Sequence, residues 1–237
     1  MGLLKRQVFG EASGKVGHVV FKKRGDITYI SGEFRGYTLP QDERSVRIRN
    51  RFSGVSKLAV AINSVSLLKQ IWAIEFPKCY TTCHQIFRQN FPRFTSGLLS
   101  GTPCLTPNSG FSLNNPKVEF SNNELIIHSG PLSPDSGINT SLEKYIIPAS
   151  VFLINTPNNP KSPITLKNRI GDKILLDPNN PLRLMINLNA GTPVVPDLTR
   201  LLKSWTVLIT LDEKNNPVDY SELITWPQKF QKVAELL

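Results

Sequence analysis

Residues 48–62 read Ile-Arg-Asn-Arg-Phe-Ser-Gly-Val-Ser-Lys-Leu-Ala-Val-Ala-Ile, and this stretch has the apolar spacing of an amphipathic helix. Its apolar side chains recur at intervals of four, three, four and three residues: Ile48, Phe52, Val55, Ala59 and Ile62. Such intervals place side chains on one face of a helix, where we expect them to be buried. Asp42 and Glu43 suit the positive end of a helix dipole, so the helix is predicted to begin near residue 42.

Two shorter helices are predicted directly after the first one. Ser66 is placed to cap a second helix, which continues to about Glu75 and is stopped by Pro77. A third helix is predicted from about residue 79 to residue 90. The helical region therefore covers approximately residues 41–91.

The sequence changes character after Pro92, where prolines separate short runs of β-branched and aromatic residues. These runs span residues 118–120, 125–128, 145–154, 173–176, 182–188, 205–211 and 218–224. Many short strands separated by turn signals are typical of an antiparallel sandwich or barrel. We therefore predict an antiparallel β-sandwich in this part of the chain.

The first forty residues contain a predicted β-hairpin. Residues 16–21 and 27–31 are β-rich, and Lys22-Lys23-Arg24-Gly25-Asp26 between them is predicted to form the hairpin loop. The chain is thus predicted to be an α+β protein. Its expected parts are a basic hairpin and helical module over residues 1–94, a linker over residues 95–107, and a β-sandwich domain over residues 108–237.

All of the net charge lies in the first hundred residues of this 237-residue chain. Residues 1–100 contain 16 Lys and Arg against 6 Asp and Glu, whereas residues 101–237 contain 12 of each, which accounts for the net charge of +10. A basic N-terminal portion favours contact with nucleic acid, anionic lipid or an acidic protein surface. The remainder, which has no net charge, indicates a second module with a different role.

The sequence shows no pattern of a membrane span or of a usual signal peptide. A spanning helix needs about 20 mostly apolar residues, and the apolar-leaning stretch 60–76 is interrupted by six polar residues. The N-terminus lacks the apolar core of a signal peptide before the polar residues 10–15. We therefore expect no membrane span and a cytoplasmic or particle-associated location.

No motif in the sequence has a recognisable catalytic or cofactor-binding pattern. Gly10-Glu11-Ala12-Ser13-Gly14-Lys15 has three residues between its glycines, where a phosphate-binding loop has four, and Val16 follows the lysine. Cys79, Cys83 and His84 are close in sequence, but a structural zinc site needs a fourth ligand. We expect reduced thiols, no metal, no cofactor, no catalytic residue and no enzymatic activity.

The predicted binding residues are basic and form two groups. They are Lys22, Lys23 and Arg24 at the hairpin tip, and Arg44, Arg47 and Arg51 in the first turns of the long helix. Helix geometry places these arginines beside the apolar stripe. Three interpretations stay open: the arginine stems cover the edge of the core, the arginines form a protein interface, or they contact nucleic-acid phosphates.

Residues 9–94 contain a series of short strings: Ser13-Gly14-Lys15-Val16-Gly17, Tyr29-Ile30, Arg49-x-Arg51-Phe52, Ala61-Ile62-Asn63-Ser64 and Phe87-x-x-Asn90-Phe91. In this order they resemble a family of uncharacterised proteins from Bacteroidota and related bacteria, which is classed as a domain of unknown function. The chain departs from that family at Phe34-Arg35-Gly36-Tyr37, where a Lys- and Pro-rich stretch is common. The resemblance implies that the hairpin and helices form one recurring module, and it implies no activity.

A basic arm joined to a neutral β-sandwich is typical of subunits of virion-like, tail-like or filamentous particles. We therefore predict a non-enzymatic structural or assembly subunit, which self-associates or docks on a protein partner through its basic N-terminal module. The alternative is a nucleic-acid-binding protein that uses the basic patch. A third hypothesis is a carbohydrate- or ligand-binding sandwich with its site in loops 130–137 or 155–163.

Overall fold

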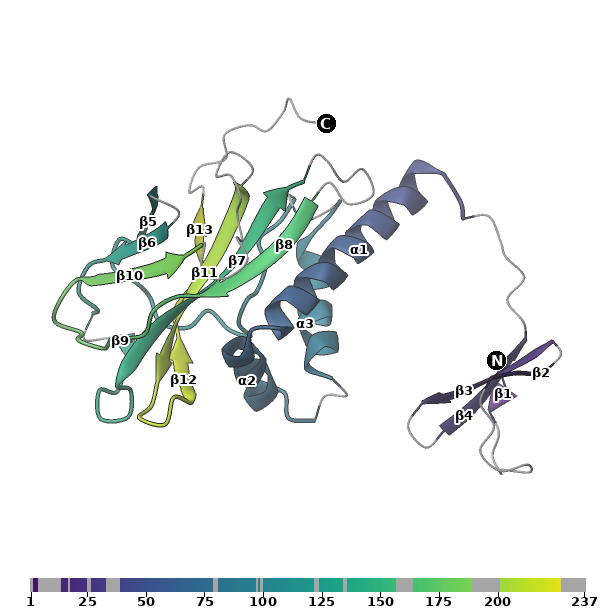
Figure 1. Cartoon of the computed structure of the whole chain (residues 1–237), viewed down its shortest axis with the longest axis horizontal. Coiled ribbons are helices and arrows are strands. Elements are labelled where there is room, and N and C mark those ends of the chain that lie inside the picture. The colour runs from purple at the N-terminus through teal and green to yellow at the C-terminus, as the bar shows by residue number, and fades with distance from the viewer. Residues whose placement is uncertain are drawn as a thin grey trace. The chain divides into compact units, whose positions relative to one another are not determined.

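The computed structural model describes most of the chain, as Figure 1 shows. The described residues are 2–3, 14–16, 18–24, 27–32, 39–78, 81–96, 98, 100–121, 124–133, 136–156, 164–188 and 201–226. The chain divides into two units, residues 1–42 and residues 43–237. Helices and antiparallel sheets occur together, which confirms the predicted α+β class.

The described strands of the N-terminal unit form a four-stranded antiparallel sheet with the order β1-β4-β3-β2. They are β1 (Gly2–Leu3), β2 (Gly14–Val16), β3 (Val19–Arg24) and β4 (Ile27–Gly32). β3 and β4 pair from Val19 opposite Gly32 to Arg24 opposite Ile27, so the predicted hairpin is present. Residues 25 and 26 of its predicted loop lie outside the described residues.

Helices open the larger unit. They are α1 (Glu43–Asn63), α2 (Ser66–Glu75), α3 (Thr82–Asn90) and the 3-10 helix η1 (Phe91–Arg93). Thr81 caps α3, because its side-chain oxygen accepts a hydrogen bond from the backbone N–H of His84 at 3.2 Å. The three predicted helices are therefore present.

The apolar stripe of α1 is buried along only part of its length. The buried side chains of α1 all lie in its second half: Val55, Leu58, Ala59, Ala61 and Ile62. Ile48 and Phe52 are instead 48% and 55% exposed. The expectation that these two side chains are buried is therefore wrong, because the first half of α1 does not face the core.

Two antiparallel sheets follow the helices. The described strands of the larger sheet are β7 (Tyr145–Asn155), β8 (Ile164–Ile170), β9 (Ile174–Leu175), β11 (Leu201–Leu211), β12 (Pro217–Tyr220) and β13 (Ile224–Trp226). Their order is β12-β11-β7-β8, with β13 also on β11 and β9 also on β7. The smaller sheet has the order β10-β6-β5, from β5 (Lys117–Ser121), β6 (Glu124–Ser129) and β10 (Leu182–Asn187).

The larger sheet lies between the helices and the smaller sheet (Figure 1). Ala149, Val151 and Leu153 of β7 belong to a core shared with the helices. The alternate residues Phe152 and Ile154 belong to a second core, shared with the smaller sheet. Because successive side chains of a strand point to opposite faces, β7 is covered on both sides. The two sheets therefore face each other, as in the predicted sandwich, and a helical layer covers the other face of the larger sheet.

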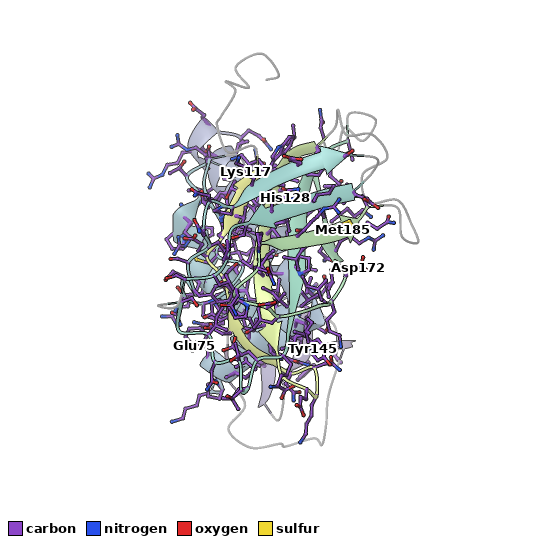
Figure 2. The ribbon with its side chains drawn as sticks, turned by 90° about the vertical axis from the view of Figure 1, so that its left-hand side faces the viewer. Glu75, Lys117, His128, Tyr145, Asp172 and Met185 are labelled. Atoms are coloured by element: carbon purple, nitrogen blue, oxygen red, sulfur yellow. The ribbon has the colours of Figure 1, made fainter. Side chains whose placement is uncertain are left out.

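The outer face of the smaller sheet carries polar side chains alongside Ile126 and Met185. Lys117 on β5, His128 on β6 and Arg183 on β10 are cross-strand neighbours on this face, and Figure 2 views the chain from this side. His128 Nε2 lies 4.0 Å from Oε2 of Glu119. Ile127, on the opposite face of the sheet, is fully buried against the larger sheet. Leu125 and Ile127, which belong to the core shared with the larger sheet, show which face of the smaller sheet packs inward.

The segment that follows η1 belongs to the core. Leu98 and Leu105 are buried, and Nε1 of Trp72 donates a hydrogen bond to the carbonyl oxygen of Leu105 at 2.8 Å. The fully buried Asn90 bonds both backbone groups of Cys104: its Nδ2 donates to the carbonyl oxygen at 3.0 Å, and its Oδ1 accepts from the N–H at 2.8 Å. The side chains of α2 and α3 thus hold this segment against the helices.

The expected domain division at a linker over residues 95–107 is therefore wrong. Apolar side chains of the helices, of this segment and of the larger sheet form one hydrophobic core. A helical module over residues 1–94 and a separate sandwich over residues 108–237 do not exist, since neither would keep that core. The division between the units falls between Asp42 and Glu43.

Among the described residues, no single helix is long and apolar enough to cross a membrane. α1 and α2 reach the necessary length and hydropathy only as a pair, and the chain bends by 100° between them. Buried side chains of both helices, such as Leu58 and Trp72, belong to the core shared with the larger sheet.

Candidate functional site

The first half of α1 presents arginines around a shallow depression of about 500 Å³. We call it the arginine depression, and it is lined by Arg44, Arg47, Ile48, Arg51, Thr95 and Ser96. The three arginines are at positions i, i+3 and i+7 of a helix and therefore share one face. The structure thus brings together the three arginines that the sequence predicted as binding residues.

Arg51 is held in place by the start of η1. Its Nε and Nη2 atoms donate hydrogen bonds to the carbonyl oxygen of Phe91 at 3.2 and 2.6 Å. The guanidinium carbon also lies 3.9 Å from the centre of the Phe91 ring. Hydrogen bonds from a cation and a cation–π contact act on the same side chain, so Arg51 is fixed before any ligand arrives.

An aromatic cluster lies beside the arginine depression. The ring centres of Phe52 and Phe87 are 5.0 Å apart, and those of Phe87 and Phe91 are 5.3 Å apart. The ring centres of Phe52 and Phe91 are 6.4 Å apart, so each of the three rings contacts the other two. Because Phe52 is more than half exposed, this cluster joins α1 to α3 and also presents an aromatic ring to solvent.

The loop after η1 supplies the polar side of the depression. The backbone N–H groups of Thr95 and Ser96 both donate to the side-chain oxygen of Ser100, at 3.1 and 3.2 Å. Leu98 of the same loop packs on Gly54 of α1, where a Cβ would lie 3.2 Å from Leu98 Cγ. The glycine allows the loop to approach the helix, so that Thr95 and Ser96 line the depression together with the arginines.

The remaining predicted basic residues belong to the N-terminal unit. Lys22 is exposed on β3. Lys23 and Arg24 also lie in β3 rather than in the predicted hairpin loop, and their side chains are outside the described part of the structure. These three residues are therefore not assigned to the arginine depression.

The cysteines and histidines are not gathered into a metal site within the described residues, where no three His, Cys, Asp or Glu side chains cluster. Cys79 lies outside the described residues, and His84 is exposed on α3. Burial raises the pKa of the Cys83 thiol and of the Cys104 thiol, and the Arg93 guanidinium only partly opposes the shift at Cys104. Both thiols are therefore kept in the protonated, weakly nucleophilic form.

A second depression, of about 420 Å³, lies where α1, α2 and β8 meet. Its central side chain, Asn168, donates hydrogen bonds from Nδ2 to the carbonyl oxygen of Ala61 at 2.8 Å and to the hydroxyl of Ser64 at 2.7 Å. Arg169 and Asp172, which have opposite charges, both line it. These contacts join β8 to the helices, and the depression has no excess of one charge sign.

Thr95, Ser96, Phe87 and Phe91 were not among the predicted site residues. They become part of the site only because α3 and the following loop fold back on α1. Residues 92–96 contain no motif that indicates this contact before the fold is known.

No protein-family model and no curated protein sequence matches the chain. The site is therefore interpreted from its own geometry. Three guanidinium groups, two hydroxyl groups and a neighbouring aromatic ring can bind an anion or an acidic surface.

Proposed function

We propose that the chain is a non-enzymatic assembly subunit of a larger protein particle, and that a neighbouring copy of the same chain covers one face of its N-terminal sheet. The observation that carries this proposal is the lack of burial in that sheet. None of the side chains described between residues 14 and 32 is buried, and Val16 is 68% exposed.

The strand register places four apolar residues of this sheet on one face. Val16 is opposite Val19 across β2 and β3, and Phe21 is opposite Ile30 across β3 and β4. Directly opposite residues share a face, and residues two apart on one strand do so as well. Val16, Val19, Phe21 and Ile30 therefore form one apolar face, which we call the arm face.

A small sheet gains stability by covering an apolar face against another element. The larger unit already has two hydrophobic cores, each formed from its own helices and strands. The arm face is therefore the surface that a neighbouring copy is best suited to cover. A head-to-tail contact between copies of one chain builds rings or filaments.

The test compares two adjacent substitutions on β3 in the full-length chain. Val19→Asp puts a charge on the arm face, whereas Val20→Asp puts the same charge on the opposite face of the same strand. Sedimentation velocity should show that the wild-type chain and Val20→Asp self-associate and that Val19→Asp does not. Equal loss of association in both variants would contradict the assignment of the arm face, and a monomeric wild-type chain would refute the proposal.

A further inference from the structure

We infer that the arginine depression binds the phosphate groups of a single-stranded nucleic acid. This inference concerns the larger unit alone and does not depend on the proposed assembly function. α1 has five basic residues and one acidic residue, and none of the residues that line the depression is acidic. A concave surface of one charge sign concentrates ligands of the opposite sign.

The chemistry of the basic groups favours phosphate. All three are arginines, and the planar guanidinium fork donates two parallel hydrogen bonds to a phosphate or carboxylate group. Arg44 and Arg47 are exposed, so their head groups are available to a ligand. The contact of Arg51 with Phe91 uses one N–H group each of Nε and Nη2, so other N–H groups of this fixed guanidinium can meet a ligand.

The arrangement of the arginines favours an extended ligand. Arg44 and Arg51 are separated by seven residues, or about 10 Å along the helix axis. A phosphodiester strand carries its charges at regular intervals and can contact the arginines one after another. A single inorganic phosphate reaches only part of this row, so it should bind much more weakly than a strand.

The aromatic ring of Phe52 distinguishes a nucleic acid from other polyanions. It lies one helical turn from Ile48 in the depression and is more than half exposed. Its ring is tilted by 57° to that of Phe87, so the contact is not a parallel stack that would cover a whole ring face. Bases stack on such rings without sequence preference, whereas lipid headgroups and acidic peptides do not need them. Phe52 therefore supplies a platform for a base beside the phosphate contacts.

The test measures binding of a fluorescein-labelled oligothymidylate to the full-length chain by fluorescence anisotropy at several salt concentrations. Three phosphate contacts on a single strand give a slope of log K against log salt of about −2, so affinity should fall roughly 20-fold between 50 and 200 mM salt. For the variant that combines Arg44→Ala with Arg47→Ala, the fall in affinity over the same salt range should be only about threefold, because one phosphate contact remains. Phe52→Leu should weaken binding about fivefold or more and leave the salt slope unchanged.

The control removes two positive charges elsewhere. Arg49 lies on α1 outside the depression, and Arg183 lies on the outer face of the smaller sheet. Arg49→Ala combined with Arg183→Ala should retain the wild-type salt slope. Circular dichroism of each variant should match that of the wild-type chain, which would show that the fold is intact.

Three results would overturn the inference. The first is that the wild-type chain does not bind the oligonucleotide at about 50 mM salt, where phosphate contacts are strong. The second is that the control variant loses as much affinity as the Arg44/Arg47 variant, which would show that binding follows net charge alone. The third is tighter binding to phosphatidylserine vesicles or to polyglutamate than to the oligonucleotide, with no effect of Phe52→Leu.

Discussion

Replacement of Asn90 by alanine is the sharpest test of the way the helices hold the following segment. Asn90 is fully buried, and its side chain makes three hydrogen bonds: to the carbonyl oxygens of Ile86 and Cys104, and from the N–H of Cys104. Alanine leaves both backbone groups of Cys104 without these partners. An unsatisfied buried group costs about 1–3 kcal/mol, so we expect a loss of about 2–4 kcal/mol, since Cys104 is only half-buried.

The free energy of unfolding can be followed by tryptophan fluorescence in urea. The three tryptophans of the chain all lie in the larger unit, so the signal reports on that unit. Gln89→Ala is the matched control, because Gln89 is the exposed neighbour of Asn90 on α3, and it should change the unfolding free energy by less than about 0.5 kcal/mol. An equally small effect of Asn90→Ala would refute the role assigned to this side chain.

Asn90→Asp separates the accepting from the donating role of the amide. The carboxylate keeps an acceptor for the N–H of Cys104, but it replaces Nδ2 by an oxygen that faces two carbonyl oxygens. Above the pKa of the aspartate, this variant should be at least as unstable as Asn90→Ala. A variant as stable as wild type would show that the two donated hydrogen bonds contribute little.

Two further changes test the same unit by urea denaturation. Gly101→Ala should destabilise the larger unit by about 1–3 kcal/mol, because a Cβ at this position would lie 2.1 Å from the carbonyl oxygen of Arg93. An unchanged unfolding midpoint would show that the loop moves away freely. Burial raises the pKa of Asp219 above the usual value of an aspartate, so the folded state binds this proton more tightly than the unfolded state. Stability therefore falls as pH rises through that raised pKa. Asp219→Asn should therefore gain stability relative to wild type with increasing pH, and a difference independent of pH would contradict this assignment.

The strands and helices that the sequence predicted are those with strong local patterns. The apolar run at residues 145–154 corresponds to β7, and the acidic start and apolar spacing at residues 42–62 correspond to α1. β8 was not predicted, because three consecutive polar residues, Lys167, Asn168 and Arg169, interrupt its apolar pattern. Asn168 is explained only by tertiary structure, since its amide bonds Ala61 and Ser64 at the end of α1.

The domain organisation was not predictable from composition alone. Ser, Thr, Gly and Pro are frequent at residues 95–107, which is typical of a linker, but Leu98 and Leu105 anchor this segment in the core. The nearly continuous apolar character of β7 was a signal that both of its faces are covered. That signal indicates a third layer, but it does not identify the helices as the elements that form it.

The candidate site was predictable only in part. The spacing of Arg44, Arg47 and Arg51 placed them on one helix face, and the structure gathers them around one depression. The same helical pattern predicted that Ile48 and Phe52 are buried, whereas both are exposed beside the arginines. Helical periodicity defines a face, and only tertiary packing decides how much of that face meets the core.

The measurement that tests the account most directly is the molar mass of the purified full-length chain by light scattering over a range of concentrations. The proposal of an assembly subunit predicts a mass above the 26.5 kDa of one chain, increasing with concentration. Nuclease treatment and high salt should leave this mass unchanged, because the arm face is apolar. A constant mass of 26.5 kDa at every concentration would contradict the account.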